Sequence, residues 1–526
     1  AGTTPVTAVE QPVGLMLDKS QGLVLGSELV TNGTFETNLN GWNNGLSMPA
    51  NGTAVWNAGG LRLTRTSSTI SYQQSITTVV GKLYKVTCNA TFVSGTGNAA
   101  IYKSDASDNV TTNPVANGSP NSESEAMNLY FTATATTTYI HCVVGTAIST
   151  TYDFDNVSVK ELPGNHAFQA TSASRPVLSA RYNLLTKTEQ FDDAAWTKTG
   201  STTVQSNVAI APDGTTTADE LTLGASGAVR QIVSVVASST AVWVKAAASG
   251  SSTHIRISTN NASAWGTGYG TKVALTSEWQ RISAAGAVTG STSTSLSIGV
   301  LIPADGSNDP DCYGKVLIWG ASIVPANQST LPYQRVNTAT DYATTGFLPY
   351  LKFDGVDDSL STNSISFTST DKMSVFAGVR KLSDAAVGVL VELSTNLNSN
   401  NGSFAVFAPV LSASRRDYRF SSKGTQGASA DTGDDYIAPV TNTLTGLGDI
   451  SGNLATLRVN GAQVAQSTAN QGTGNYGDYP LYIGRRNNAS LPFNGQLYGL
   501  IIVGKAVTAG ELSSTETYVN SKTGAY

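Results

Sequence analysis

The sequence has 526 residues, which is too long for one ordinary hydrophobic core and suggests three or four domains. With 40% hydrophobic and 8% aromatic residues the chain can bury a core, which excludes a disordered protein. A formal net charge of -5 argues against a partner held through nucleic-acid phosphates, and no apolar run reaches the ~20 residues of a membrane-spanning helix. We therefore expect no nucleic-acid partner and no membrane insertion.

Short apolar-alternating runs recur along the chain, for example at 81–93, 239–248 and 455–465. Glycine, asparagine and serine separate them, and only 13% of the residues are charged. This pattern is typical of half-buried strands joined by tight turns, and predicts an all-β protein of sandwiches or jelly rolls. Within the last run, Asn460-Gly461 between two alternating arms predicts a two-residue hairpin.

A degenerate repeat is visible in the first two thirds of the chain. One copy opens at 28–44 and closes at 152–162, and the other opens at 182–200 and closes at 314–326. Each opens with an asparagine-containing strand, an acidic loop and a tryptophan, and each closes with a strand expected to pair beside the first. The copies span roughly 135–150 residues, the usual size of one β-sandwich domain.

The one helix that the sequence predicts lies near the C-terminus. Thr508 is placed as its N-cap and Glu511 as the matching residue of a capping box. Leu512, Thr515 and Val519 would lie on one face of this short helix.

The three cysteines do not form a disulfide framework. Cys88 and Cys142 lie in apolar strand-like runs, and Cys312 lies in a turn-rich segment. Buried free thiols are favoured, and a Cys88–Cys142 bridge is the alternative.

Three groups of motifs carry a family resemblance. The segments "NGTFE" with "GW" and "FDNVSV" of the first copy resemble jelly-roll carbohydrate-binding modules. The second copy, with "NLLTKTEQFDDAAWTKTG" and "VLIWGASIV", is similar to a module common in bacteriophage virion proteins. Most of 341–526, with "LPYLKFDGVDDSLST" and "LYIGRRNNASLPFNGQLYGLIIVG", resembles the concanavalin/laminin-G-like sandwich.

The order of these motifs implies a nested arrangement. In phage proteins of this type the counterparts of "LMLDKS" (15–20), "PGNHAFQATSASRPVL" (163–178) and "LKFDGVDD" (351–358) follow one another closely. Loop tips tolerate insertions, so two insertions into one sandwich account for the spacing. A linear array of three domains is the alternative. The nested reading assigns 1–22 plus 163–181 plus 341–526 to the sandwich, 23–162 to the first jelly-roll insert and 182–340 to the second. The predicted fold is thus all-β, with three antiparallel β-sandwich or jelly-roll modules, one of them discontinuous, and a short C-terminal helix.

Catalysis has little support. Glycoside hydrolysis needs two carboxylates about 5–10 Å apart. The acidic pairs are Asp192-Asp193, Asp357-Asp358 and Asp434-Asp435. All three stand beside turn residues, where aspartate is a common turn former. The histidines His141, His166 and His254 have no neighbour at ligand spacing. We predict that the chain is not an enzyme.

Sugar binding needs exposed aromatic rings beside amides and carboxylates. The candidates are Trp42, Trp56 and Tyr72 in the first jelly roll, and Trp265 and Tyr269 in the second. The last two lie in a loop rich in glycine and asparagine, where a role in the core is least natural. For the others a structural role is the alternative.

No cofactor is required by any motif, and a structural Ca²⁺ is the single ion that the resemblances suggest. In jelly-roll carbohydrate modules it lies between the first and last strands. The matching positions here are Asn32, Glu36 and Asp155. A rim loop of the concanavalin-like module offers Asp354, Asp357 and Asp358. Acidic turns without a metal are the alternative for both sets.

Taken together, the resemblances imply a bacteriophage virion surface protein, either a tail fibre or a head fibre or decoration protein. Its partners would be other virion proteins and host-surface polysaccharide, and it would form a homo-oligomer, with a trimer expected. Weak sites would become useful through many copies on one particle. A polysaccharide depolymerase, an architectural part without a ligand and a secreted adhesin are the rival readings.

Overall fold

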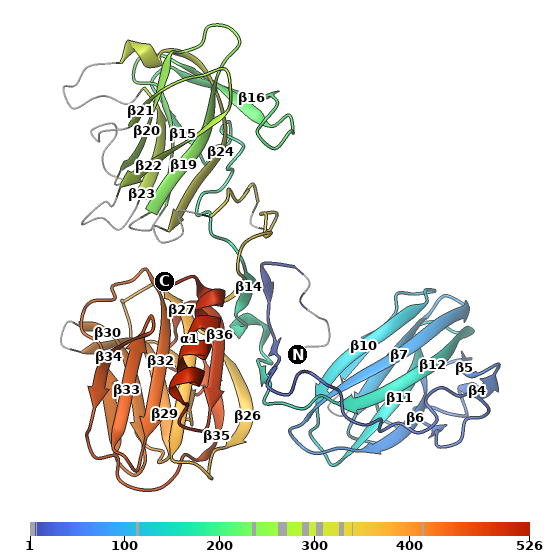
Figure 1. The fold of residues 1–526 in the computed structure, drawn as a ribbon. Coiled ribbons are helices and arrows are strands. Elements are labelled where there is room, and N and C mark those ends of the chain that lie inside the picture. The colour runs from blue at the N-terminus through green and yellow to red at the C-terminus, as the bar shows by residue number, and fades with distance from the viewer. Residues whose placement is uncertain are drawn as a thin grey trace.

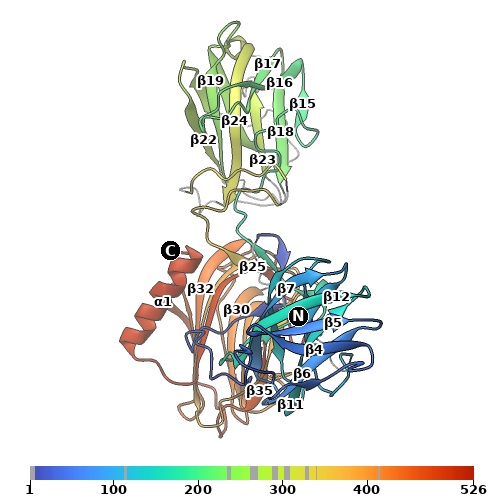
Figure 2. The ribbon, with the colours of Figure 1, turned by 90° about the vertical axis from the view of Figure 1, so that its right-hand side faces the viewer.

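The structure is a computed structural model of residues 1–526. It describes all of them except 1–5, 7, 112–114, 234–237, 261–270, 287–293, 301–308, 326–330, 339 and 413–414. The described residues form six antiparallel sheets and one α-helix, α1 (Ala509–Thr523), besides two 3₁₀ turns, η1 (Ser172–Ser174) and η2 (Pro310–Cys312). Two packed sheets make up each of three modules, which appear as separate lobes in Figure 1; in Figure 2 the second insert stands apart from the other two modules. The predicted all-β fold class is confirmed.

The largest module is a sandwich of two eight-stranded sheets. In spatial order the first sheet contains β1 (Gln11–Pro12), β14 (Val177–Ser179), β25 (Tyr350–Asp354), β36 (Asn494–Val503), β27 (Lys372–Lys381), β32 (Val440–Asp449), β33 (Leu454–Val459) and β34 (Ala462–Ser467). The second contains β2 (Leu15–Met16), β13 (Ala167–Phe168), β26 (Leu360–Ser366), β35 (Asp478–Ile483), β28 (Val389–Leu393), β29 (Ser403–Ser412), β30 (Arg415–Lys423) and β31 (Gly427–Asp431).

Three distant segments of the chain build this sandwich. In the first sheet β1 pairs with β14, which pairs with β25. In the second sheet β2 pairs with β13, which pairs with β26. Each of the first two segments therefore adds one short strand to each sheet, and the module is discontinuous. The residue limits drawn above for the two inserts stay predictions.

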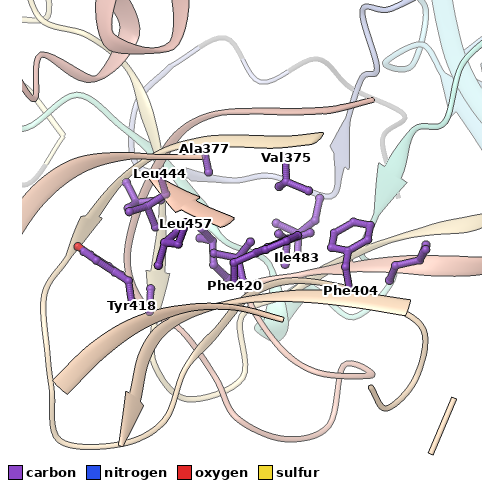
Figure 3. Packing of buried hydrophobic residues seen from close by; sticks show 14 of the residues in the cluster. Val375, Ala377, Phe404, Tyr418, Phe420, Leu444, Leu457 and Ile483 are labelled. Atoms are coloured by element: carbon purple, nitrogen blue, oxygen red, sulfur yellow. The ribbon is translucent and has the colours of Figure 1, made fainter. Parts of the chain in front are cut away.

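The core of the sandwich lies between its two sheets, where side chains of both interdigitate (Figure 3). Val375, Ala377, Leu444 and Leu457 come from one sheet and Phe404, Tyr418, Phe420 and Ile483 from the other. Strand β27 is buried on both faces, because α1 packs against the side away from this core. Gly378 permits that approach, since a Cβ there would collide with Thr523 of the helix.

Two local predictions are confirmed. The capping box is present: the Thr508 hydroxyl accepts from the Glu511 N–H at 3.3 Å, and the Glu511 carboxylate accepts from the Thr508 N–H at 2.9 Å. The hairpin between β33 and β34 turns at Asn460 and Gly461, with φ of 52° and 77°. Two successive positive φ angles are what a tight two-residue hairpin requires.

The buried face of α1 differs in part from the prediction. Val519 is buried, but Leu512 and Thr515 are only half-buried, and Glu516 is buried instead. Glu516 can lie there because its carboxylate pairs with Arg458 of β33, with Nε and Oε1 2.8 Å apart. In the described part of the chain, no helix is both long and apolar enough to cross a membrane.

The two inserts have the same topology. One sheet of the first contains β4 (Gly52–Asn57), β5 (Gly60–Arg65), β12 (Thr150–Glu161), β7 (Leu83–Ser94) and β10 (Glu125–Thr132), and the other β3 (Asn43–Asn44), β6 (Ile70–Thr77), β11 (Thr137–Gly145), β8 (Asn98–Ser104) and β9 (Val115–Gly118). The corresponding sheets of the second contain β16 (Thr202–Ala209), β17 (Ala218–Leu223), β24 (Gly314–Pro325), β19 (Ser238–Ala246) and β22 (Gln280–Gly286), and β15 (Thr197–Thr199), β18 (Ala228–Val233), β23 (Thr294–Gly299), β20 (His254–Asn260) and β21 (Thr271–Ala274). Strands β3–β12 correspond one to one with β15–β24, which explains the repeat in the sequence.

A matching hydrogen bond pattern fixes the opening segment of both inserts. The Gln74 amide donates to the Thr31 carbonyl at 2.9 Å and accepts from the Thr31 N–H at 2.8 Å. Gln231 makes the same pair of bonds to Thr186, both at 2.8 Å. A buried glutamine thus replaces the strand partner that the opening segment lacks.

The three cysteines, Cys88, Cys142 and Cys312, are free and buried. This agrees with the favoured prediction for their thiols.

Candidate functional site

One sheet of the first jelly roll presents a row of polar and aromatic side chains on its outer face. The strand register places Asn43, Gln73, His141 and Tyr102 beside one another across β3, β6, β11 and β8. Side chains alternate along a strand, and the adjacent Ile140 points into the core. The row therefore faces away from the core, and we call it, together with Tyr139, the polar–aromatic face.

A buried histidine holds the centre of this face rigid. His141 is fully buried and lies 2.8 Å from the Ser104 hydroxyl through Nε2 and 3.3 Å from the Ser71 hydroxyl through Nδ1. Ser104 donates its own proton to the Ala106 carbonyl, so the His141 Nε2–H is the donor in that bond. Burial lowers the pKa of His141 to about 4, and the ring is neutral at physiological pH.

A loop is anchored over the row beside His141. The Gln73 amide donates to the Asp108 carboxylate at 2.6 Å and to the Ser107 hydroxyl at 3.1 Å. Both partners belong to the segment after β8, and both are exposed. The loop thus adds a carboxylate and a hydroxyl at the border of the polar–aromatic face.

Tyr102 and Tyr139 are the ligand-accessible aromatic residues of this face. Both are half-buried, and Tyr139 pairs with Ser104, two residues from Tyr102 on the same face. Such diagonal neighbours lie about 7–8 Å apart. Neither hydroxyl forms a hydrogen bond to any residue that the structure describes. Two half-buried rings with free hydroxyls provide the stacking surface and polar groups that a sugar needs. The exposed Asn43 amide lies at the other end of the row, three strands from Tyr102.

Sequence reasoning missed both tyrosines. The usable signal was strand alternation: in "AAIYKS" and "TYIHC" each tyrosine is next to an isoleucine. If Ile101 and Ile140 face the core, then Tyr102 and Tyr139 must face outward. That the two tyrosines become neighbours depends on the pairing of β8 with β11.

Two of the predicted sugar-binding residues are placed in or against the core. Trp42 is 4% exposed, its ring centroid lies 5.3 Å from that of Phe35, and its Nε1 donates to the Thr31 carbonyl at 3.2 Å. Tyr72 packs against the same core. Trp42 is thus a core residue, while Tyr72 is half-buried and packs against the core with the inward-facing side chains of β6.

The remaining aromatic candidates are Trp56, which is exposed, and the pair Trp265 and Tyr269. Trp56 is 45% exposed at the end of β4, although its Nε1 donates to the Phe35 carbonyl at 2.6 Å. One side of its ring is therefore open to a ligand. Trp265 and Tyr269 lie outside the described residues.

The first predicted calcium set is only partly assembled. The chain around Asn32 lies beside the closing strand, because the Val157 N–H donates to the Gly33 carbonyl at 2.9 Å. The Asn32 amide donates to the Asn38 carbonyl at 2.9 Å, and the Asp155 carboxylate accepts from the Asn156 N–H at 2.6 Å. Glu36 is exposed and takes part in no described bond with either. Local hydrogen bonds thus occupy the Asp155 carboxylate and the Asn32 amide nitrogen.

The second predicted calcium set does come together. One oxygen each from Asp354, Asp357 and Asp358 lies within 4.8 Å of the others. Gly355, with φ of 77°, makes the turn that brings them together. The Ser174 hydroxyl, from a different segment of the discontinuous sandwich, donates to the Asp357 carboxylate at 2.7 Å.

The charge of this acidic loop is costly without a cation. Asp358 is 7% exposed, and burial together with the neighbouring Asp354 raises its pKa to about 6. Hard carboxylate oxygens are the ligands that Ca²⁺ prefers, and backbone carbonyls or water can complete its shell of six to eight. The three aspartates fit a calcium site of this kind.

Comparisons with known proteins agree with this architecture. Residues 354–513 match a family described as the Concanavalin A-like lectin/glucanases superfamily, which supports the resemblance seen in the C-terminal region. The matched stretch begins at the acidic loop. No curated protein matches the sequence.

Several solved structures are similar to parts of the chain. The CBM40 of the Ruminococcus gnavus IT-sialidase is 13% identical and covers 30% of this chain and 97% of its own, with a TM-score of 0.24. The SAP-like pentraxin from Limulus polyphemus is 10% identical and covers 31% and 80%, with a TM-score of 0.26. The CBM22-1–CBM22-2 tandem domain of Paenibacillus barcinonensis Xyn10C is 11% identical and covers 57% and 98%, with a TM-score of 0.25. At these identities and scores no role is transferred from them.

Proposed function

We propose that this chain is a non-enzymatic surface protein of a bacteriophage particle, a tail fibre or a head fibre or decoration protein, that binds host-surface glycans. The observation that carries the glycan-binding part is the pair Tyr102 and Tyr139 on the polar–aromatic face. The resemblance of the sequence to virion modules supports the phage part. The concanavalin-like match of the C-terminal module is compatible with both.

The proposed mechanism is reversible stacking. A pyranose ring would cover one tyrosine ring, while its hydroxyls bond to the free tyrosine hydroxyls. Further sugar units of the same glycan would extend along the row toward the Asp108 carboxylate and the Asn43 amide. His141 and Gln73 do not contact the sugar and hold the face in place. A single site of this kind is weak, and display of many copies, as trimers on one particle, would raise the avidity.

The test is glycan-array and host-cell binding by the purified chain, with Tyr102→Ala and Tyr139→Ala beside the parent. Losing one stacking ring is expected to weaken binding about tenfold, from the typical worth of such contacts. Tyr518→Ala is the matched control, because Tyr518 is 56% exposed on α1, far from this face in the fold. Equal binding by all variants would remove the polar–aromatic face as the site.

Two further arms address the rest of the proposal. Trp265→Ala tests whether the second jelly roll contributes a separate sugar site. Incubation with host polysaccharide is expected to release no reducing ends, and their release would instead establish a depolymerase.

Labelling of intact particles with an antibody to this chain tests the virion location, and sedimentation tests the trimer.

A further inference from the structure

Half of strand β36 has an unpaired edge. On one side β27 pairs with it as far as Val503. On the other side β25 pairs only with Asn494–Leu497, because the chain before Tyr350 leaves the sheet toward the second insert. Among the described residues, the backbone of 499–502 has no strand partner on that side. About half of these residues direct their N–H and C=O groups to the open edge, as in any antiparallel strand.

A cavity of about 840 Å³ lies beside this edge. Its walls come from three places: the sandwich with Leu15, Leu178 and Leu500, the chain after β2 with Leu17, and the first jelly roll with Tyr130. The N-terminal segment, which contributes Val13 and Gly14 to the lining, runs between the sandwich and the first jelly roll (Figure 1). Leucine, valine and methionine make up half of the lining residues, and Tyr350 and Tyr498 line the cavity together with Tyr130, so the walls suit apolar side chains.

The cavity reaches the backbone of β36 itself. Gly499 lines it, and a Cβ built on this glycine would meet no atom within 4 Å. Its φ does not lie in the left-handed region, so a side chain there would not strain the backbone. The backbone of β36 therefore borders the cavity at a residue without a side chain.

The rim of the cavity is positively charged. Lys19 and Arg175 both line it, and neither forms an ion pair with a described residue. Arg175 donates to the carbonyls of Gln169 at 3.0 Å and Ala170 at 2.9 Å, which fixes its position but leaves its charge uncompensated. A carboxylate on a ligand would complement both cations.

From the open edge, the apolar walls and the cationic rim, we propose that this cavity binds an extended peptide segment of a partner protein as an added strand on β36. The peptide would pair with residues 499–502 over roughly 13 Å, at about 3.3 Å per residue. Apolar side chains at alternate positions would enter the cavity, and an acidic residue at one end would meet Lys19 and Arg175. This surface is separate from the polar–aromatic face and does not rest on glycan binding.

The experiment uses the full chain and fluorescein-labelled octapeptides with leucine or valine at alternate positions, threonine between them, and glutamate at the first or last position. Fluorescence anisotropy is expected to show saturable binding. The same peptides with lysine in place of glutamate should bind several-fold more weakly, and N-methylation of alternate backbone nitrogens should abolish binding in one of its two registers. Amides of 499–502 should gain protection from hydrogen exchange when the peptide is present.

Two variants locate the site. Gly499→Trp would place a bulky ring next to the open edge and is expected to weaken peptide binding at least about tenfold. Gly510→Trp is the matched control, because a Cβ at Gly510 of α1 also meets nothing within 4 Å. Lys19→Glu should weaken binding of the glutamate peptides and not of the lysine peptides, whereas Lys522→Glu should change neither.

Absence of binding by every peptide would overturn the proposal, as would equal binding by the Gly499→Trp and Gly510→Trp variants. Self-association of the parent chain that Gly499→Trp abolishes, without peptide binding, would assign the edge to a second copy and also overturn it. Glycan binding by the Gly499→Trp variant is expected to equal that of the parent. A failure of the peptide proposal can therefore be told apart from a failure of the glycan-binding proposal.

Discussion

At the scale of single residues, His141 links the stability of the first jelly roll to pH. Its pKa in the folded chain is about 4, against an ordinary value near 6.5. As the pH falls below 6.5, His141 becomes protonated in the unfolded chain but stays neutral in the folded chain. The contribution of His141 to the free energy of unfolding, present above pH 6.5, is therefore lost by about pH 4. The loss should reach about 3 kcal/mol. Calorimetry between pH 7 and 4 should show it, and His141→Gln should reduce it.

The control for that experiment is His254→Gln. His254 is half-buried on β20 of the second jelly roll and should leave the acid sensitivity of the first unchanged. If both variants follow the pH dependence of the parent, His141 is not its source.

For the sandwich, the raised pKa of Asp358 predicts a pH dependence of stability opposite to that of His141. Because its pKa is raised to about 6, the folded chain keeps this proton at pH values where the unfolded chain has lost it. The resulting stabilisation is therefore lost as pH rises through about 6, where three charged aspartates repel one another. Ca²⁺ should offset that repulsion and raise the unfolding temperature at pH 7.5, by roughly 2–4 °C per kcal/mol of binding free energy. At pH 5 the proton competes, and the effect should shrink.

Asp358→Asn should remove the response to calcium, whereas Asp435→Asn, at an exposed aspartate elsewhere on the sandwich, should retain it. Thermal unfolding that is unchanged by Ca²⁺ or chelator at pH 7.5 would show that the loop is a metal-free acidic turn.

At the scale of elements, the capping box of α1 decides how firmly the helix covers β27. Thr508→Ala removes the side-chain acceptor for the Glu511 N–H and should cost about 1 kcal/mol. Hydrogen exchange should then speed up at the amides of the first helical turn and, through loss of the packed helix, at β27. Thr517→Ala, at an exposed threonine of the same helix, is the control, and equal exchange in the two variants would contradict a capping role.

At the scale of the whole molecule, the nested arrangement predicts that the first insert can be removed. The two segments that connect the first insert to the sandwich lie side by side, since the Gly26 N–H donates to the Glu161 carbonyl at 2.8 Å. Replacing 23–162 with a short glycine–serine turn should leave a folded sandwich with nearly the same unfolding temperature. The fragment 341–526 alone should be markedly less stable, because β25 and β26 would lose their outer partners β14 and β13. Equal stability of fragment and parent would show that the strands of the first two segments contribute little to the stability of the sandwich.

Local signals in the sequence were sufficient for several features. Strand alternation indicated an all-β fold, Asn460-Gly461 a hairpin and Thr508 with Glu511 a capped helix, because each depends on residues close together in the chain. The spacing of the family motifs also indicated a discontinuous sandwich, and β1, β14 and β25 do pair in one sheet. The acidic loop could be predicted for the same reason, since its three aspartates lie within five residues of sequence.

Other features were decided only by the tertiary structure. Trp42 and Tyr102 are both aromatic residues in strand-like surroundings, yet one fills the core and the other faces outward, because burial depends on which face of a sheet meets its partner sheet. Tyr102 and Tyr139 became neighbours through the pairing of β8 with β11. The open edge of β36 arises because the chain before β25 leaves the sheet toward the second insert, and no residue type marks such an edge in a sequence. Sequence alone thus determined the elements and their order, while strand pairing and sheet packing determined which side chains and backbone groups are free to bind.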